Sequence, residues 1–422
     1  MSSEAVIRHS ESPVRIVRRA RVVPAEQPRQ FRRLDVFVKI SETCNIACTY
    51  CYYYEGGDDS HLNHPAYMSV ETIANMAAFL ERSIKVSGVE ELVINFHGGE
   101  PMMMQKWRFD EMCQTLRDRL QPLVNVSFGM QTNAMLIDEE WIALIGRHDV
   151  SMGLSLDGPP EYHDEFRVDH KGRGTYERTL KGIRLLQSAF ANGQIKQGFG
   201  LICVVDERRD AKRTLDHFVD VVGIKNVFFA LPMHSHDDLD PARVPAFTKY
   251  LCDVFDAWVE RNDREIRVRF IDHMLGLVMA GEKGLEIRES SKRNSTMFTI
   301  ASNGELGCQD EERTLRPDLF AQGVAANGEV SLADFYALPV VDEYLKDKDT
   351  LAPACTKCTW QRVCDGGYEL SGNAQRFSRE AGFANASVYC QTIQALLTKM
   401  VKFAMSKGVP FSQIERSLVN VR

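Results

Sequence analysis

Residues 39–52 read Lys-Ile-Ser-Glu-Thr-Cys44-Asn-Ile-Ala-Cys48-Thr-Tyr-Cys51-Tyr, and this stretch decides the expected fold and chemistry. Three cysteines stand in a C-x3-C-x2-C pattern directly after a predicted strand. Three thiolates can ligate three irons of a cubane cluster and leave the fourth iron without a protein ligand. A structural zinc site needs a fourth protein ligand, and nothing nearby supplies one. The pattern therefore predicts a [4Fe-4S] cluster with one open position.

Strand-like and helical patterns alternate on both sides of this stretch. We expect strands at 36–40, 92–96, 124–131, 151–156, 197–205 and 227–231. We expect helices at 69–87, 105–120, 138–147, 176–190, 211–222 and 241–261. Six such units predict an α/β fold with a parallel sheet and right-handed crossovers. Six are too few to close an eight-stranded barrel, so we expect a partial (β/α)6 TIM-like barrel with its chemistry at the carboxyl ends of the strands.

Composition sets broad limits on location and partners. The 422 residues carry a net charge of −7, which disfavours nucleic acid as a partner. No apolar run has the length of a membrane helix, and the first residues lack a secretory signal, so we expect a cytoplasmic protein without a membrane partner. A basic arm, residues 1–33, is interpreted as solvated or as a docking arm for an acidic peptide. Its arginines are Arg8, Arg15, Arg18, Arg19, Arg21, Arg29, Arg32 and Arg33.

The cysteine motif, its place after the first strand and the aromatic Tyr50 before the third cysteine resemble the radical S-adenosylmethionine (SAM) superfamily. The next strand ends in His97-Gly98-Gly99-Glu100-Pro101, which looks like the glycine-rich SAM-binding turn of that family. The resemblance implies that Cys44, Cys48 and Cys51 hold the cluster that cleaves SAM.

Two further strand ends fit the same resemblance. Gln131 closes the third strand, and Ser155 closes the fourth, with Arg167 following. This part is similar to peptide-modifying radical SAM enzymes related to sulfatase maturases. It implies that Tyr50, the Gly98–Glu100 turn, Gln131, Ser155 and Arg167 contact the cofactor. Alternatively Asp157-Gly158 is only a turn, Arg167 a surface residue and His97 a loop cap.

A second cysteine cluster follows near the carboxyl end: Cys355, Cys358, Cys364 and Cys390. Four thiolates can close a cluster completely, although they also suit a zinc knuckle. The spacing resembles the SPASM domain of radical SAM peptide maturases. The full pattern has seven cysteines, and Tyr368 stands where one of them is expected. We therefore predict one auxiliary [4Fe-4S] cluster, with Cys308 a leftover thiol or an alternative ligand.

The tail resembles one SPASM subgroup more specifically, the Xye-, Grr- and Fxs-type three-residue cyclophane synthases. The resemblance is carried by Gly366-Gly367-Tyr368, Arg376-Phe377-Ser378 and residues 382–390, Gly-Phe-Ala-Asn-Ala-Ser-Val-Tyr-Cys. Residues 369–375 depart from the pattern as an insertion. The resemblance implies an oxidoreductase that joins an aromatic ring carbon to a β-carbon in a ribosomal precursor peptide (a RiPP maturase).

Such chemistry needs a reducing partner such as flavodoxin or ferredoxin, and a group that takes a proton when the ring regains aromaticity. Asp310, Glu311 and Glu312 follow Cys308 and are candidates, although an acidic run is usually only solvated. No single one is favoured, and we record Asp310 and Glu311 as the catalytic candidates.

Two other functions remain open. One is a different radical SAM peptide modification, formylglycine formation or a thioether crosslink. In sulfatase maturases an aspartate follows the cysteine corresponding to Cys308, and Gln309 stands there instead. The other is a non-enzymatic iron–sulfur scaffold or electron carrier.

The expected domains follow from these patterns. We predict the basic arm at 1–33, the radical SAM partial barrel at 34–285, a SPASM-like auxiliary-cluster domain at 286–395, and a helix and tail at 396–422. Cys113, Cys203 and Cys252 lie in apolar periodic segments and are interpreted as buried structural thiols.

Overall fold

The computed structural model describes residues 29–367, 370 and 372–418, and one curved sheet forms its centre. Its strands are β1 (Arg33–Ser41), β3 (Glu91–Gly98), β4 (Asn125–Thr132), β5 (Val150–Ser155), β7 (Phe199–Val204), β8 (Asn226–Ala230), β9 (Arg267–Val268), β10 (Ser295–Ile300) and β11 (Leu306–Gly307). A separate two-stranded sheet pairs β2 (Ile46–Cys48) with β6 (Arg167–Asp169).

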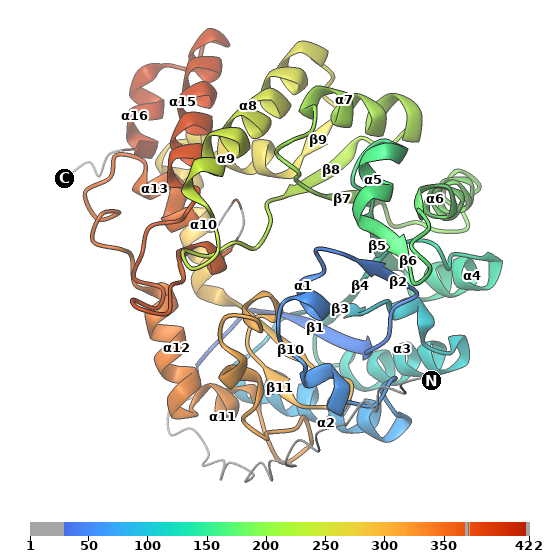
Figure 1. Ribbon diagram of the computed structural model, residues 1–422. Coiled ribbons are helices and arrows are strands. Elements are labelled where there is room, and N and C mark those ends of the chain that lie inside the picture. The colour runs from blue at the N-terminus through green and yellow to red at the C-terminus, as the bar shows by residue number, and fades with distance from the viewer. Residues whose placement is uncertain (1–28, 368–369, 371, 419–422) are drawn as a thin grey trace, which may run out of the picture.

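Helices surround the sheet (Figure 1). The longer ones are α2 (Val70–Ser87), α3 (Lys106–Leu120), α4 (Glu139–His148), α6 (Tyr176–Ala191), α8 (Val244–Arg261), α9 (Arg269–Ala280), α10 (Glu282–Asn294), α12 (Pro339–Asp349), α15 (Cys390–Ser406) and α16 (Phe411–Leu418). The shorter α-helices are α1 (Tyr52–Glu55), α5 (Pro160–Phe166), α7 (Ala211–Asp216), α11 (Leu332–Tyr336) and α13 (Gln361–Cys364). A π-helical turn, η3 (His217–Val222), follows α7.

Single 3-10 turns occur at loop and helix junctions. They are η1 (Ser60–Asn63), η2 (Pro101–Met103), η4 (Pro241–Arg243), η5 (Asp310–Glu312), η6 (Pro317–Phe320), η7 (Asp365–Gly367) and η8 (Ala374–Arg376).

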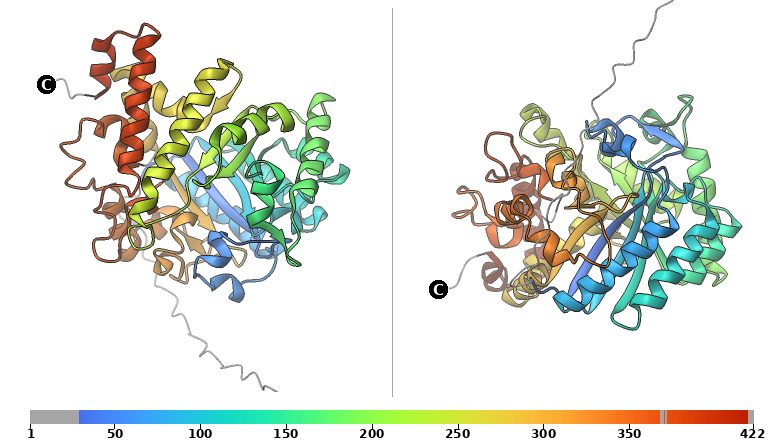
Figure 2. Two further views of the ribbon diagram at one scale, coloured as in Figure 1. Left: turned by 45° about the horizontal axis from the view of Figure 1, so that its top comes forward. Right: turned by 90° about the horizontal axis from the view of Figure 1, so that it is seen from below.

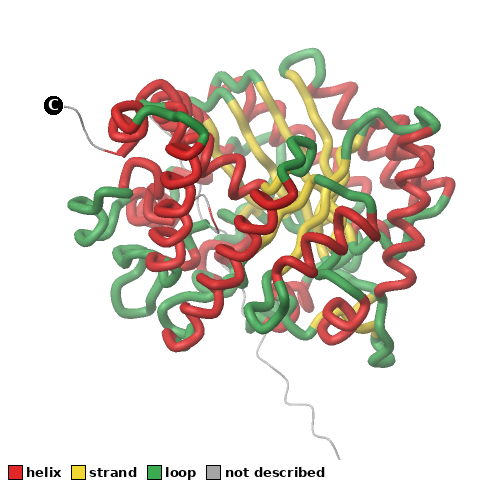
Figure 3. Tube along the Cα trace, turned by 90° about the horizontal axis from the view of Figure 1, so that it is seen from above, coloured by secondary structure: helices red, strands yellow, loops and turns green. Residues whose placement is uncertain are grey.

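The strand order is β11-β10-β1-β3-β4-β5-β7-β8-β9. The six predicted strands are its central six, in order and parallel, so the prediction of a parallel α/β partial barrel is confirmed. Neighbouring strands lie side by side in Figure 3. The sheet has two free edges, at β11 and β9, so it is an open arc.

Two flanking strands were not predicted. β10 pairs in parallel with β1 from Arg33 opposite Ser295 onward, and β9 adds two residues beside β8. β9 has only two residues, which is too short for a periodic signal. β10 has six residues, but its sequence Ser-Thr-Met-Phe-Thr-Ile begins with polar residues and its burial does not alternate, so it lacks a clear strand pattern. The segment after residue 285 was assigned to the SPASM-like domain, and its residues 295–300 extend the sheet of the barrel.

Strand β1 shows how one face of the sheet packs into the core while the other lines a cavity. Leu34, Val36 and Val38 are fully buried in the hydrophobic core. Asp35 and Phe37 point the other way and line the cavity inside the arc. Because side chains alternate along a strand, one face meets the helices and the other faces a cavity with room for chemistry.

The carboxyl-terminal region packs on the barrel through helices. In Figure 2, α15 runs beside α8, and the two helices contact one another. Helix α15 also contacts α9, and α16 contacts α9 and α10. The carboxyl end of the chain thus supports the side of the arc where β8 and β9 lie.

The basic arm is described only from Arg29 onward, and Arg8, Arg15, Arg18, Arg19 and Arg21 lie outside the described residues. The described arginines of the arm pair with the protein's own carboxylates: Arg29 with Asp342, Arg32 with Glu90 and Arg33 with Asp35. Among the described residues, no helix is both long and apolar enough to cross a membrane.

Strand β10 contributes to the hydrophobic core, and a substitution of Phe298 tests how much this contributes to stability. Phe298 is fully buried and packs edge-on against Phe79 of α2, with ring centroids 6.0 Å apart. We expect Phe298→Ala to lower the free energy of unfolding by about 3–5 kcal/mol, because it removes apolar contacts and leaves a void. Denaturant unfolding measures this loss. The matched control is Trp107→Ala at a 58% exposed site, which should change stability by no more than about 0.5 kcal/mol.

Candidate active site

The first cysteine set lies at the carboxyl end of β1, at the mouth of the arc. Cys48 lies opposite Arg167 in the small β2–β6 sheet, and the Cys51 amide donates to the Cys48 carbonyl at 3.1 Å. Cys51 also precedes the first residue of α1. Cys44, Cys48 and Cys51 all line one cavity of about 1700 Å³ that runs along the inside of the sheet. The structure therefore brings together the three cysteines that the motif predicts.

The surroundings of these thiols fit a thiolate-held cluster. The Asn133 side-chain amide lies 4.0 Å from the Cys44 sulfur, and a guanidinium nitrogen of Arg167 lies 3.9 Å from the Cys48 sulfur. Both are donors that stabilise sulfur with negative charge. Burial raises the pKa of Cys44 to about 12 and that of Cys48 to about 11. Such thiols are poor nucleophiles by themselves, and iron binding would displace their protons.

Among the described residues, no group of three or more His, Cys, Asp or Glu side chains converges on a point that one metal ion would occupy. A cubane cluster is larger than an ion, so its ligands stand farther apart. The donor set therefore suits a cluster with one iron free of protein ligands.

The glycine-rich turn after β3 packs against the cysteine loop. Gly98 has φ +142°, and a Cβ at either Gly98 or Gly99 would collide with the backbone of Ser41 or Thr43. The Gly99 amide donates to the Ser41 carbonyl at 2.9 Å. The close approach of two backbones explains the glycines, as their lack of a side chain allows. Contact of this turn with SAM remains a prediction.

Glu100 joins the ends of two strands. Its carboxylate accepts hydrogen bonds from the Thr132 hydroxyl at 2.6 Å, the Asn133 amide at 2.8 Å and the Met102 amide at 3.1 Å. Burial raises its pKa to about 7. Both oxygens are used within the protein, so Glu100 orders the cavity wall.

The other predicted polar contacts line the same cavity. The Gln131 amide donates to the Ser155 hydroxyl at 2.9 Å. Arg167 is buried, forms an ion pair with Asp157 at 2.7 Å, and is therefore not the surface residue of the alternative interpretation. Tyr50 donates to the same Asp157. Asp157 thus holds Arg167 and Tyr50 beside the cysteine loop.

A buried ion pair crosses from β1 to the segment after Cys308. Lys39 is fully buried, and its ammonium lies 2.5 Å from the Asp310 carboxylate and 3.1 Å from Nδ1 of His97. The Tyr52 hydroxyl also donates to Asp310. Burial raises the pKa of Asp310, but its charged neighbours, Lys39 foremost, together lower it more, so the net shift is downward. Burial and Lys39 lower the pKa of His97 to about 3, so His97 is neutral.

The other two residues of the acidic run, Glu311 and Glu312, point in different directions. Glu311 is exposed to the cavity, and the surrounding protein and Asp310 raise its pKa to about 7. Glu312 is buried and accepts a hydrogen bond from Tyr344. Burial raises the Glu312 pKa to about 8. The expectation that an acidic run is only solvated is therefore wrong for Asp310 and Glu312.

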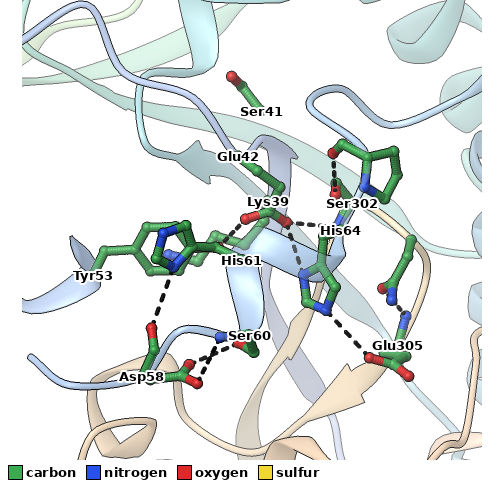
Figure 4. Close-up of polar contacts among 12 residues, drawn as sticks. Lys39, Ser41, Glu42, Tyr53, Asp58, Ser60, His61, His64, Ser302 and Glu305 are labelled. Carbon is green, nitrogen blue, oxygen red and sulfur yellow. Dashed lines mark hydrogen bonds and ion pairs between the residues drawn. The ribbon is translucent and has the colours of Figure 1, made fainter. Parts of the chain in front are cut away.

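Another polar cluster fixes the segment that follows α1. Figure 4 shows His64 between Glu42 and Glu305, with nitrogen–oxygen distances of 3.4 Å and 3.3 Å. The Tyr53 hydroxyl donates to Glu42, and the Ser302 amide donates to it at 3.1 Å. Burial disfavours the charged imidazole of His64, but the carboxylates of Glu305 and Glu42 together stabilise it more strongly. The pKa of His64 therefore rises to about 9.

The second cysteine set also comes together. Cys355, Cys358, Cys364 and Cys390 line one small pocket beside Trp360 and Gln394. Cys364 ends α13 and Cys390 begins α15, so a helix end supplies each of the last two thiols. Cys308 lies elsewhere: it is 2% exposed within the hydrophobic core and lines neither this pocket nor the large cavity.

The tail motif has a structural role next to this pocket. The Arg376 guanidinium donates to the carbonyl of Lys348 at 2.8 Å and to that of Phe383 at 2.7 Å. The Asn385 amide donates back to the Arg376 carbonyl at 3.0 Å. These residues hold the turn that leads to Cys390, so the motif shapes the pocket. Tyr368 and Glu369 lie outside the described residues.

Comparison with known proteins adds to this geometry. Residues 38–216 match the family model of the radical SAM superfamily. This part of the chain is a radical SAM domain. The match contains all three cysteines, the Gly98–Glu100 turn and Arg167. The expected cofactors, a [4Fe-4S] cluster and SAM, agree with this family.

Similar proteins extend beyond the radical SAM domain. A cysteine-type anaerobic sulfatase-maturating enzyme of Clostridium perfringens strain 13 is 23% identical over 378 residues, 85% of this chain and 94% of that protein. A serine-type enzyme of Bacteroides thetaiotaomicron is 26% identical over 382 residues, 82% of this chain and 84% of that protein.

A solved structure of native anSMEcpe with bound AdoMet and the Kp18Cys peptide shares the fold. It has a TM-score of 0.69 at 21% identity, over 89% of this chain and 98% of that one. The likeness thus reaches well past the radical SAM domain into the region of the second cysteine set.

Several residues of the site were not predicted. Lys39, Glu42, Tyr52 and His64 flank the cysteine motif and build its support. Alternation along β1 could have indicated Lys39, because Asp35, Phe37 and Lys39 share one strand face. Lys39 and Tyr52 contact Asp310, Glu42 contacts Ser302 and His64 contacts Glu305, each more than two hundred residues away, so no local pattern indicates these contacts.

The His64 cluster predicts a pH-dependent stability. The folded pKa is raised above the ordinary 6.5, so the stabilisation is fully present below about pH 6.5 and is lost as the pH rises through about 9. We expect His64→Gln to lower the free energy of unfolding by about 1–2 kcal/mol near neutral pH, after allowance for solvent screening. Denaturant unfolding of both proteins measures this. A difference that stays constant up to about pH 10 would contradict the charge assignment.

Proposed function

We propose that this protein is a radical SAM enzyme that modifies a side chain of a peptide or protein substrate. The observation that carries the proposal is the placement of Cys44, Cys48 and Cys51 at the mouth of a cavity of about 1700 Å³. That volume exceeds the usual pocket of a single small ligand and suits a nucleoside cofactor together with a peptide segment.

When bound, a reduced cluster with an open iron supplies the electron that cleaves SAM to methionine and a 5′-deoxyadenosyl radical. This chain's own residues hold and orient the reactants. Gln131 and Ser155 present polar groups to the cofactor, and the Asp157–Arg167 pair keeps the cysteine loop in place. The cavity holds a substrate β-hydrogen close to the site and away from bulk water.

Formylglycine formation is the first candidate for the product. The curated relatives that span most of this chain are cysteine-type and serine-type anaerobic sulfatase-maturating enzymes. The peptide in the solved relative, Kp18Cys, indicates the kind of substrate. On this proposal, Cys355, Cys358, Cys364 and Cys390 hold one auxiliary [4Fe-4S] cluster that receives an electron, and flavodoxin or ferredoxin is the reductant.

A cyclophane crosslink in a ribosomal precursor peptide is the second candidate. Gln309 occupies the place where the sulfatase maturases are expected to have aspartate. The tail from Gly382 to Cys390 has the subgroup pattern, although its residues also serve to shape the auxiliary pocket. Both reactions begin with loss of a β-hydrogen and continue with loss of one electron and one proton.

The radical step has a direct test. Anaerobically reconstituted wild-type protein with SAM and dithionite should release 5′-deoxyadenosine. Cys44→Ala should reduce release by about 100-fold or more, because the cluster loses a ligand. The matched control is Cys113→Ala, which removes a buried core thiol and should leave release unchanged. Equal release from wild type and Cys44→Ala would leave a non-enzymatic scaffold as the better interpretation.

The product has a separate test. Wild-type enzyme would be incubated with Kp18Cys, with its serine counterpart, and with short peptides encoded next to the gene. Tandem mass spectrometry should show an aldehyde at the former cysteine or serine if formylglycine forms. Loss of two hydrogens shared between an aromatic ring and a nearby β-carbon would indicate the crosslink instead.

A further inference from the structure

We propose that Glu311 is the group that takes the proton when the substrate radical is oxidised. The inference rests on the proposed function and assigns one residue to a step that both candidate reactions share. The substrate Cβ–H bond first breaks, and its hydrogen atom goes to the 5′-deoxyadenosyl radical. The carbon radical then loses one electron to an oxidised iron–sulfur centre and one proton to the Glu311 carboxylate. In the serine case a C=O bond forms, and in the cysteine case a C=S bond forms that water hydrolyses. In the crosslink the β-carbon radical first adds to an aromatic ring carbon, and the resulting ring radical then loses the electron and the proton of that ring carbon, so that the ring regains aromaticity.

The neighbours of Glu311 are unsuited to this task. Gln309 stands directly after Cys308 and has an amide, which does not take a proton at ordinary pH; its nitrogen lies 3.3 Å from the Met297 sulfur. Asp310 also lines the cavity, but its side chain is only 5% exposed and is held by the Lys39 ammonium at 2.5 Å and by Tyr52. Glu312 points into the core toward Tyr344.

Glu311 faces the cavity that the three radical SAM cysteines also line. No residue of the described chain donates a hydrogen bond to its carboxylate, and the backbone at Gly372 passes so closely that a Cβ there would lie 3.1 Å from Oε2. A carboxylate with free oxygens next to a reaction space is available to a substrate.

Most other carboxylates of the cavity wall already have partners. Asp157 pairs with Arg167, Asp206 with Arg209, Glu207 with Arg243, and Asp238 with His234. Glu55 is exposed on α1 and lines the same cavity, and the described residues give it no partner either, so Glu55→Gln tests the competing assignment. Glu111 is exposed on α3, is not part of the cavity wall and serves as the matched control.

The charges that act on Glu311 come from several elements. Asp310 and Glu312 belong to its own turn, Tyr52 lies on α1, and Arg269 begins α9. The surrounding protein and Asp310 raise its pKa to about 7, whereas Arg269 opposes the rise. A base with such a value both accepts and returns a proton near neutral pH.

Glu311→Gln tests the assignment with deuterated substrate. The probe is Kp18Cys carrying deuterium on the cysteine β-carbon, and in parallel the adjacent-gene peptides with deuterated β-carbons. We expect wild-type levels of deuterated 5′-deoxyadenosine from Glu311→Gln, with product formation reduced by about 100-fold or more. Glu311→Asp should recover part of the product, and Glu111→Gln should match wild type. Loss of product in Glu55→Gln with wild-type product in Glu311→Gln would assign the step to Glu55 and refute the proposal.

Each other outcome contradicts either the assignment of Glu311 or the proposed function itself. Wild-type product rates and an unchanged pH profile in Glu311→Gln would refute the assignment and leave the proposed function standing. Loss of deuterium transfer along with product would place Glu311 before the proton step and also refute it. If wild-type enzyme transfers no deuterium from any of these peptides, the proposed function fails, and the assignment fails with it.

A measurement without cofactor gives an independent check of the carboxylate itself. A raised folded pKa means that stability falls as the pH rises from about 4.5 to about 7, because the folded state binds the proton more tightly. Thermal unfolding of the cofactor-free full chain should therefore show a smaller loss between these pH values for Glu311→Gln than for wild type or Glu55→Gln. Identical losses in all three proteins would show that Glu311 is an ordinary solvated carboxylate and overturn the proposal.

Discussion

The buried ion pair between Lys39 and Asp310 connects the two halves of the site. Lys39 is the last charged residue of β1 before the cysteine loop, and Asp310 follows Cys308 in the carboxyl-terminal half. A buried charge without its partner costs several kcal/mol, so the two segments cannot separate cheaply. The pair thereby fixes η5 against the end of β1 and holds the Asp310 carboxylate on Lys39, while the next carboxylate, Glu311, stays exposed on the cavity wall.

Buried polar groups around the first cysteine set are also paired with partners from other parts of the chain. Asp157, Glu100 and Glu42 are buried carboxylates, and each accepts hydrogen bonds from several donors on different segments of the chain. Buried polar groups need such partners, and fully satisfied networks are rigid. The cysteine loop itself has little regular structure, so these carboxylates supply the order that a cluster site requires.

The comparisons carry different amounts of information. The family model over residues 38–216 supports the radical SAM assignment. The chain also shares an extended fold with anSMEcpe at 21% identity, and this likeness concerns the fold alone. Because function depends on a few groups placed on a common scaffold, the shared fold does not choose between the candidate products.

The sequence by itself determined the central six βα units, the spacing of Cys44, Cys48 and Cys51, and the grouping of Cys355, Cys358, Cys364 and Cys390. These features are local: hydrophobic period, turn residues and short motif spacing carry them. It did not indicate that β10 joins β1, because the polar start of β10 and its non-alternating burial give no clear strand pattern.

Only the tertiary structure decided which partner each polar side chain around the cavity has and how exposed it is. Asp310 and Glu311 are adjacent in sequence and both line the cavity, yet Asp310 is buried and paired with Lys39, whereas Glu311 is exposed. Likewise Cys308 is separated from the other cysteines by burial in the core. Such outcomes depend on contacts between segments hundreds of residues apart, where burial and electrostatic pairing act together and no local pattern records them.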